Sequence, residues 1–139
     1  MADAAPIPSR AAEILSRKPI GYMSTQRPDG RMSVVPVAVI WDGQNVRISS
    51  VKGTKKVRNL QLDARLTLCV PHPDNPQQYV ELRGTAEIAD DADRGFVNAM
   101  AKEWMGLDEY PYDRPGDERV IITLRVEAVS SPAVHGTRE

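Results

Sequence analysis

The feature that most constrains the fold is a series of short stretches in which apolar and polar residues alternate. This period of two is typical of strands that bury one face. Turn-forming residues separate the first stretches, with Arg-Pro-Asp-Gly at 27–30 and Asp-Gly-Gln-Asn at 42–45, and they predict hairpins. We therefore expect six strands, at residues 20–25, 32–41, 46–50, 66–70, 79–88 and 120–129.

Three short stretches have helical spacing instead. We expect Ser9 to cap the first helix and Thr54 the second. In the third, Phe96, Met100 and Trp104 recur every four residues, with Val97 and Ala101 beside them on the apolar face. Loops are expected at 72–77 and 108–117. Strands and helices do not alternate as they do in parallel sheets. The pattern therefore predicts a mainly β (α+β) chain, a six-stranded antiparallel barrel with short peripheral helices.

The composition limits the class of protein. With 139 residues, 41% of them apolar and 27% charged, the chain suits one globular domain over 1–139, with loose tails at 1–8 and 131–139. The net charge of −1 gives no general electrostatic support for nucleic-acid binding. One cysteine excludes an internal disulfide. Because the sequence has no secretory signal and no long apolar run, we expect a cytoplasmic protein without a membrane span.

A cluster of lysines surrounds the expected start of the second helix. Lys52, Lys55 and Lys56 flank Gly53–Thr54, where the glycine lets the chain turn sharply from strand into helix. The N–H groups of a first helical turn and the positive end of the helix dipole favour an anion. The segment does not match the nucleotide-binding pattern G-x-x-x-x-G-K-[ST]. Two interpretations stay open at this point: a phosphate site and a solvated, lysine-rich helix start.

Other chemistries have weaker support. His72 and His135 stand apart, and Cys69 has no partner at ligand spacing, so we expect no metal site. Cys69 alternates with core residues, which favours a small buried hydrophobe over a nucleophile. Residues 49–52 match S-x-x-K, but the companion motifs of that enzyme class are missing. Pro36 lacks a ladder donor and predicts an edge, a bulge or a ligand-facing gap in the second strand. No catalytic side chain is assigned.

Three segments carry a resemblance to a known family: IGYMSTQRPDGRMSVVPV at 20–37, KGTKKVRNLQLDARLTLCV at 52–70 and VELRGTAEI at 80–88. They resemble the pyridoxamine 5′-phosphate oxidase-like superfamily, whose fold is the FMN-binding split β-barrel. The chain is more similar to the branch that uses coenzyme F420. In the oxidase branch a Ser-Arg-Lys triplet holds the FMN phosphate, and here the triplet reads Thr54-Lys55-Lys56. The run from Lys56 to Leu60 is more similar to the deazaflavin branch.

This resemblance implies a homodimer with the cofactor in a groove between two barrels. F420 carries a phosphate and an anionic, glutamylated tail, for which the lysine-rich helix offers several cations. The ring would lie against the strand around Pro36 and the strand end at Ser49-Ser50. The implied cofactor-binding residues are Val35, Pro36, Val37, Ser49, Ser50, Lys52, Lys55, Lys56, Arg58 and Asn59.

The implied activity is hydride transfer between F420 and an unidentified small organic substrate. The protein would supply positioning and electrostatics, and the proton donor would be solvent or Tyr79. Two alternatives stay open: an FMN-binding oxidase or flavin reductase of the same superfamily, and a non-catalytic F420-binding or carrier protein. FMN has a single phosphate and needs fewer cations than this helix presents, which favours F420.

Overall fold

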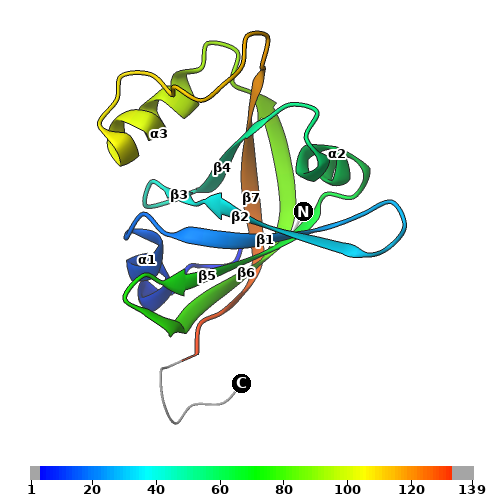
Figure 1. The fold of residues 1–139 in the computed structure, drawn as a ribbon. Coiled ribbons are helices and arrows are strands. Elements are labelled where there is room, and N and C mark those ends of the chain that lie inside the picture. The colour runs from blue at the N-terminus through cyan, green and yellow to red at the C-terminus, as the bar shows by residue number, and fades with distance from the viewer. Residues whose placement is uncertain (1–3, 133–139) are drawn as a thin grey trace.

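A computed structural model describes residues 4–132 of the chain as one curled antiparallel sheet with three short helices around it (Figure 1). Within this range the sheet has seven strands in the order β2-β1-β5-β6-β7-β4-β3. The strands are β1 Ile20–Gln26, β2 Met32–Ala38, β3 Ile40–Trp41, β4 Val46–Val51, β5 Arg65–His72, β6 Asn75–Asp90 and β7 Arg119–Ser130. The helices are α1 Ser9–Leu15, α2 Lys55–Leu62 and α3 Gly95–Met105. The curled antiparallel sheet agrees with the expected split barrel.

The prediction of six strands was wrong because the strand expected at 32–41 breaks at Val39. The backbone N–H of Val39 donates to the carbonyl of Pro19 (3.1 Å) instead of joining a sheet ladder. Up to Ala38 the chain pairs with β1, and from Ile40 it pairs with β4. The strands β2 and β3 therefore lie at opposite edges of the sheet although one residue separates them. At Val39 the chain therefore passes directly from one edge of the curled sheet to the other, which brings the two edges together.

The prediction of a loop at 72–77 was also wrong. Strand β5 runs to His72 and β6 begins at Asn75, so only Pro73 and Asp74 form the turn. The imidazole Nδ1 of His72 accepts a hydrogen bond from the Asp74 N–H (3.0 Å), and the Asn75 side chain accepts one from the Gln77 N–H (3.2 Å). Side chains thus satisfy backbone donors where prolines prevent regular pairing.

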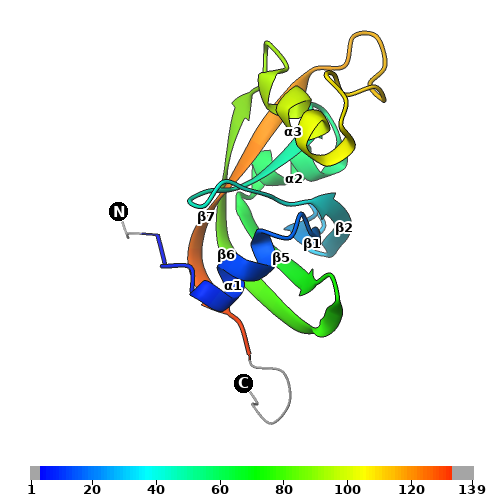
Figure 2. The same ribbon diagram turned by 90° about the vertical axis from the view of Figure 1, so that its left-hand side faces the viewer.

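The core inside the curl is aliphatic, as the composition predicts. Its largest fully buried side chains come from β1, β4, β5, β6 and β7, from α1 and α2, and from Val39 between β2 and β3. Helix α1 packs against β5 and β6 through Ala11, Ile14 and Leu15 (Figure 2). The expected cap of this helix was wrong by one residue, because Pro8 is the N-cap and Ser9 is already helical. The fixed φ of proline, here −60°, suits the residue that leads into a helix.

Helix α3 lies outside the barrel and buries part of its predicted apolar face more deeply than the rest. Val97 and Ala101 are fully buried, whereas Phe96, Met100 and Trp104 are only half-buried. The Arg47 guanidinium on β4 stacks over the Phe96 ring at 4.9 Å, so part of the predicted apolar face covers a charged side chain. None of the helices within residues 4–132 is long and apolar enough to cross a bilayer.

Candidate functional site

The candidate site begins where β4 ends and the chain turns into α2. Gly53 adopts φ +89°, and Thr54 takes the N-cap position, as expected from the sequence. Its hydroxyl, however, donates to the Val51 carbonyl (2.9 Å) and lies 3.3 Å from the Ser50 hydroxyl. The side chain therefore does not cap the helix, and the N–H groups of the first turn remain available to an outside acceptor.

Lys56 and Arg119 form the recessed, positively charged side of this site. Lys56 is half-buried, and its pKa is lowered first by burial and then by the nearby charge of Arg119. Among residues 4–132, no carboxylate forms an ion pair with Lys56. An anion bound between the two cations would stabilise both charges. This geometry favours the phosphate site over a freely solvated helix start.

Arg119 is held in place by the loop that follows α3. Its Nε donates to the Asp113 carboxylate (2.8 Å), its Nη2 donates to the second oxygen of that group, and the guanidinium lies 4.6 Å from the centre of the Tyr110 ring. Arg94 also donates to Asp113 (2.8 Å). The side chains of Arg119 and Asp113 are only 9% and 10% exposed. The hydrogen bonds from Arg119 are the main reason that the pKa of Asp113 falls to about 2.

The sequence analysis missed this arrangement because Arg119 and Asp113 lie far from the lysine cluster along the chain. Arg119 reaches the site because β7 pairs antiparallel with β4, which places Arg119 opposite Val51. Strand order in a barrel is a tertiary property. An acidic loop directly before a strand that begins with arginine was the available local signal.

Lys52 lies in a different environment from Lys56. Its ammonium group is 3.7 Å from carboxylate oxygens of both Asp90 and Glu118. A cavity of about 330 Å³ beside it is lined by Lys52, Asp90, Asp91, Ala92, Arg94, Asp117, Glu118 and Arg119. With four carboxylates in its lining, this cavity is poorly suited to an anionic group. The structure thus separates Lys52 from the other cations of the predicted cluster.

A second basic surface lies on the other side of α2. Lys55 and Arg58 face the β1–β2 turn, which brings Arg27 to them around a cavity of about 280 Å³. The lining is completed by Pro28, Asn59 and Leu62, so it contains no acidic residue. The described part of the chain provides no ion-pair partner for any of these three cations. Arg27 was missed because it looked like part of an ordinary turn.

The predicted ring-binding residues divide into outward and inward groups. Pro36 is exposed on the edge strand β2, opposite Tyr22, which confirms that this proline marks a sheet edge. Val35 is half-buried and Val37 is 8% exposed, so both point toward the core. Ser49 is half-buried on the outer side of β4, where its hydroxyl accepts a hydrogen bond from Arg119 (3.3 Å).

Two other predicted site residues are buried and have structural partners. Ser50 is 2% exposed and contacts Thr54. Asn59 is 5% exposed, and its amide donates to the Thr25 hydroxyl (3.1 Å), which ties α2 to β1. Their side chains therefore shape the site from within, and direct cofactor contact by these side chains stays a prediction.

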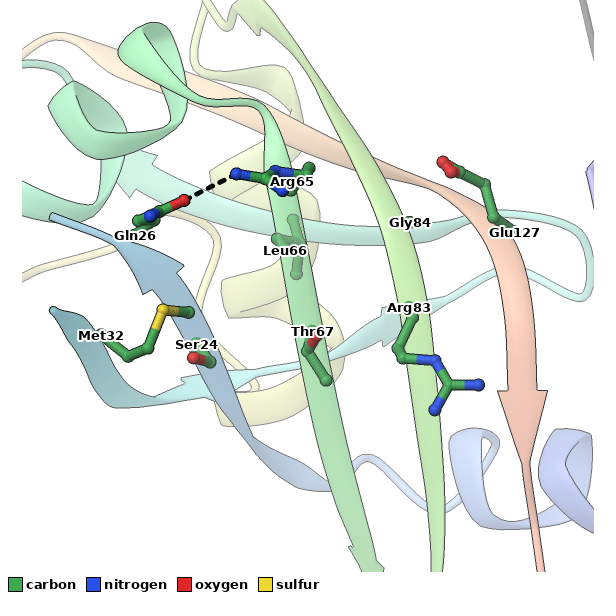
Figure 3. A pocket seen from close by; sticks show the side chains of 9 residues that line it. All are labelled: Ser24, Gln26, Met32, Arg65, Leu66, Thr67, Arg83, Gly84 and Glu127. Atoms are coloured by element: carbon green, nitrogen blue, oxygen red, sulfur yellow. Dashed lines mark hydrogen bonds between the residues drawn. The ribbon is translucent and has the colours of Figure 1, made fainter. Parts of the chain in front are cut away.

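A hollow and an apolar strip lie on the outer face of the sheet. The hollow, of about 440 Å³, is lined by Ser24, Gln26, Met32, Arg65, Leu66, Thr67, Arg83, Gly84 and Glu127 (Figure 3). Arg65 donates to the Gln26 side chain across it (2.8 Å). The strip begins at its edge and consists of Ile20, Tyr22, Met32 and Val34, which are 46–62% exposed. Alternation predicted outward positions on these strands but gave no reason to expect four large apolar side chains there.

The remaining candidate residues offer little chemistry. Cys69 is half-buried, and burial raises the pKa of its thiol, with a smaller effect from Glu81, so the thiol form is favoured. His72 lies 3.5 Å from the Glu13 carboxylate and helps to hold α1. Tyr79 pairs with Pro71 across the β5–β6 ladder, and its role as a proton donor stays a prediction. His135 lies outside the described residues. Residues 4–132 contain no group of three metal-binding side chains.

Comparisons with known proteins agree with this architecture. A family model described as pyridoxamine 5′-phosphate oxidase matches residues 7–131. A solved structure of an F420 reductase is 31% identical, and the alignment covers 89% of this chain and 98% of that one, with a TM-score of 0.77. No curated protein matches the chain.

More distant structures share the fold alone. An FMN-binding protein from Nostoc punctiforme, related to pyridoxamine 5′-phosphate oxidase, is 16% identical over 97% of this chain and 88% of that one, with a TM-score of 0.69. A heme-binding protein from Mycobacterium smegmatis is 21% identical over 95% of this chain and 57% of that one, with a TM-score of 0.70. The same barrel therefore carries different ligands, and the residues of the site must decide between them.

Proposed function

Because the chain belongs to the pyridoxamine 5′-phosphate oxidase family, we propose that it is an F420-dependent oxidoreductase of the cytoplasm. The proposed reaction is hydride transfer between the deazaflavin and a small organic substrate with an electron-poor double bond. One observation carries the choice of cofactor: the cations around α2 form two separate groups, one at Lys56 and Arg119 and one around Arg27. A cofactor with a single phosphate needs only one of them.

The two groups suit the two anionic parts of F420. Lys56, with the uncapped first turn of α2 and the charge of Arg119, would hold the phosphate. Arg27, Lys55 and Arg58 would hold carboxylates of the glutamylated tail in their open cavity. The identity of 31% to an F420 reductase supports the same cofactor.

The proposed role of the residues near the expected ring position is to orient the cofactor ring rather than to react with the substrate. When bound, F420 supplies the hydride-transfer chemistry itself. Pro36 presents an exposed apolar surface on the edge of the sheet, against which a flat ring can pack and from which water is displaced. Ser49 offers a half-buried hydroxyl on the outer side of β4. Nothing in this arrangement requires a covalently reacting side chain, and solvent or Tyr79 remains the proposed proton donor.

We further propose that the outer apolar strip packs against a second copy of the chain. Strand β2 is an edge of the sheet, and the four exposed apolar side chains on β1 and β2 form the kind of surface that associates in water. Val34→Glu combined with Met32→Glu should therefore convert a dimer into a monomer in sedimentation velocity. Met105→Glu, which adds charge to an exposed apolar position on α3, is the control and should leave the dimer intact. A wild-type monomer that still binds cofactor would exclude the shared groove.

FMN is the second candidate because Lys56 and Arg119 alone can satisfy one phosphate. Absorbance titrations of the purified protein with F420 and with FMN separate the two cofactors, and we expect the tighter binding for F420. Turnover of reduced F420 with a panel of enones and quinones then separates an enzyme from a carrier. Binding of F420 without turnover of any acceptor would favour the carrier, and exclusive binding of FMN would overturn the proposed cofactor.

A further inference from the structure

The loop after α3 reaches the cofactor site through a chain of three side chains that the activity proposed above does not explain. Asp113 in the loop binds Arg119 at the start of β7, and Arg119 binds Ser49 on β4. The first link is a two-point ion pair between side chains that are nearly buried. The second link is a single hydrogen bond of 3.3 Å from Nη1 to the serine oxygen.

The direction of the second link follows from the chemistry of the groups. A guanidinium can only donate hydrogen bonds, so Ser49 must accept from Arg119 with one of its lone pairs. Its own hydroxyl proton is then left for another acceptor. Within the described residues Ser49 makes no other side-chain hydrogen bond. The half-buried hydroxyl is therefore a donor without an acceptor among the described residues, near the strand end where the ring is expected.

The first link fixes the position from which Arg119 donates. Asp113 holds both the Nε and the Nη2 edge of the guanidinium, and the Tyr110 ring packs against its face. Arg94 donates to the Asp113 oxygen that also accepts from the Arg119 Nε, and no hydrogen bond joins Arg94 to Ser49 within the described residues. A planar group held along one edge by two hydrogen bonds and packed on one face has little rotational freedom, so its remaining Nη1 points in a constant direction.

We propose that Asp113 positions Arg119, and that Arg119, besides the charge it adds near the phosphate, positions Ser49 as a hydrogen-bond donor to the bound cofactor. The ligand chemistry that fits is an acceptor oxygen or nitrogen, such as a carbonyl on the polar edge of a flavin-type ring or a phosphate oxygen. The loop from α3 thereby affects cofactor binding through Ser49 without contacting the cofactor. This inference rests on the proposed function, because it needs a cofactor of this class at the strand end.

A double-mutant cycle on cofactor affinity tests the chain of contacts. Ser49→Ala removes the donor, and Arg119→Lys keeps the positive charge but loses the fixed geometry. We expect each single variant to weaken binding about tenfold, and the double variant also about tenfold, because both changes remove the same hydrogen bond. Independent contributions would multiply to about a hundredfold and would overturn the proposal. Ser49→Thr, which keeps a hydroxyl, should restore most of the affinity.

Two further variants separate positioning from general stability. Asp113→Asn should weaken binding in the wild-type background and have no further effect beside Ser49→Ala; it replaces Arg119→Lys in the cycle if that variant does not fold. Arg94→Lys is the matched control, because Arg94 contacts Asp113 but not Ser49, and affinity should stay within about twofold. An equal loss in Arg94→Lys would assign the effect to loop stability and contradict the inference.

The cofactor is probed as F420 and as FMN in parallel titrations at one ionic strength. If either cofactor binds the wild-type chain and the double variant loses no more affinity than each single variant, the inference holds. If a cofactor binds and the affinity losses of the two single variants multiply in the double variant, the inference falls while the proposed function stands. If neither binds, the proposed function fails and the inference fails with it.

Discussion

The two sides of α2 show how one short helix can present cations in opposite ways. Lys55 and Lys56 are consecutive, so their side chains project about 100° apart. Lys56 turns inward, where it is half-buried near Arg119. Lys55 turns outward to an open cavity that it shares with Arg27 and Arg58. The inner side combines half-buried Lys56 with nearly buried Arg119, which Asp113 holds in place, and the outer side consists of exposed side chains without ion-pair partners in the described structure.

This difference predicts unequal energies. A buried cation site is strong because water competes poorly there, but it depends on groups that hold it in place. Exposed cations contribute little individually and are screened by salt. The inner side should therefore determine whether an anion binds, and the outer side should determine which anionic cofactor is preferred.

The largest expected effect comes from breaking the support of the inner side. Asp113→Ala leaves Arg94 and Arg119 without their shared carboxylate in a nearly buried position. We expect the free energy of unfolding to fall by about 2–3 kcal/mol, somewhat less than for a fully enclosed pair because a cavity adjoins Arg119. Chemical denaturation measures the loss. Asp63→Ala, which removes the partner of the exposed Arg65, should cost clearly less; an equal cost would contradict the comparison.

The same carboxylate predicts a dependence of stability on pH. The pKa of Asp113 is lowered from 3.8 to about 2 in the folded chain, so the group favours folding above its ordinary pKa. This contribution should be lost as the pH falls from about 4 through 2, because protonation then favours the unfolded state. Asp63 titrates in the same window, since its pKa is also about 2. The test is therefore the difference between wild type and Asp113→Asn, which should shrink toward pH 2 and stay constant above pH 5.

The next largest expected effect is a loss of cofactor affinity when Lys56 is removed from the inner side. Lys56→Ala should weaken binding of both F420 and FMN by about 1.5–3 kcal/mol, the range for a hydrogen bond to a charged group, and toward the lower end because Lys56 is half-buried. Titration at fixed salt measures this loss. Lys52→Gln serves as the control, because Asp90 and Glu118 already neutralise Lys52. Unchanged affinity in Lys56→Ala would remove this lysine from the site.

Much of the local structure on the inner side of α2 could be predicted from the sequence. Alternation placed β4 correctly, and Gly53-Thr54 marked the turn into α2, because these are local preferences of the backbone. The family resemblance was confirmed by the matching family model. Sequence spacing did not separate Lys52 from Lys56, since the acids that pair with Lys52 come from β6 and the loop before β7.

The groups that complete the site come from elsewhere in the chain. Arg27 reaches α2 through the β1–β2 turn, and Arg119 through the pairing of β7 with β4. The break at Val39 likewise depends on a hydrogen bond to Pro19, which local patterns do not contain. Periodicity describes which face of a strand is buried. It does not describe which strands become neighbours.

The smallest effect tests the central claim most directly. If the outer side of α2 recognises the glutamylated tail, Arg27→Gln with Arg58→Gln should weaken F420 binding by about 0.2–1 kcal/mol per residue and leave FMN binding nearly unchanged. Titrations of both cofactors at two ionic strengths measure this difference, with Lys52→Gln as the control. High salt should remove most of it. Equal losses for F420 and FMN, or no loss for either, would contradict the account of two separate anion sites.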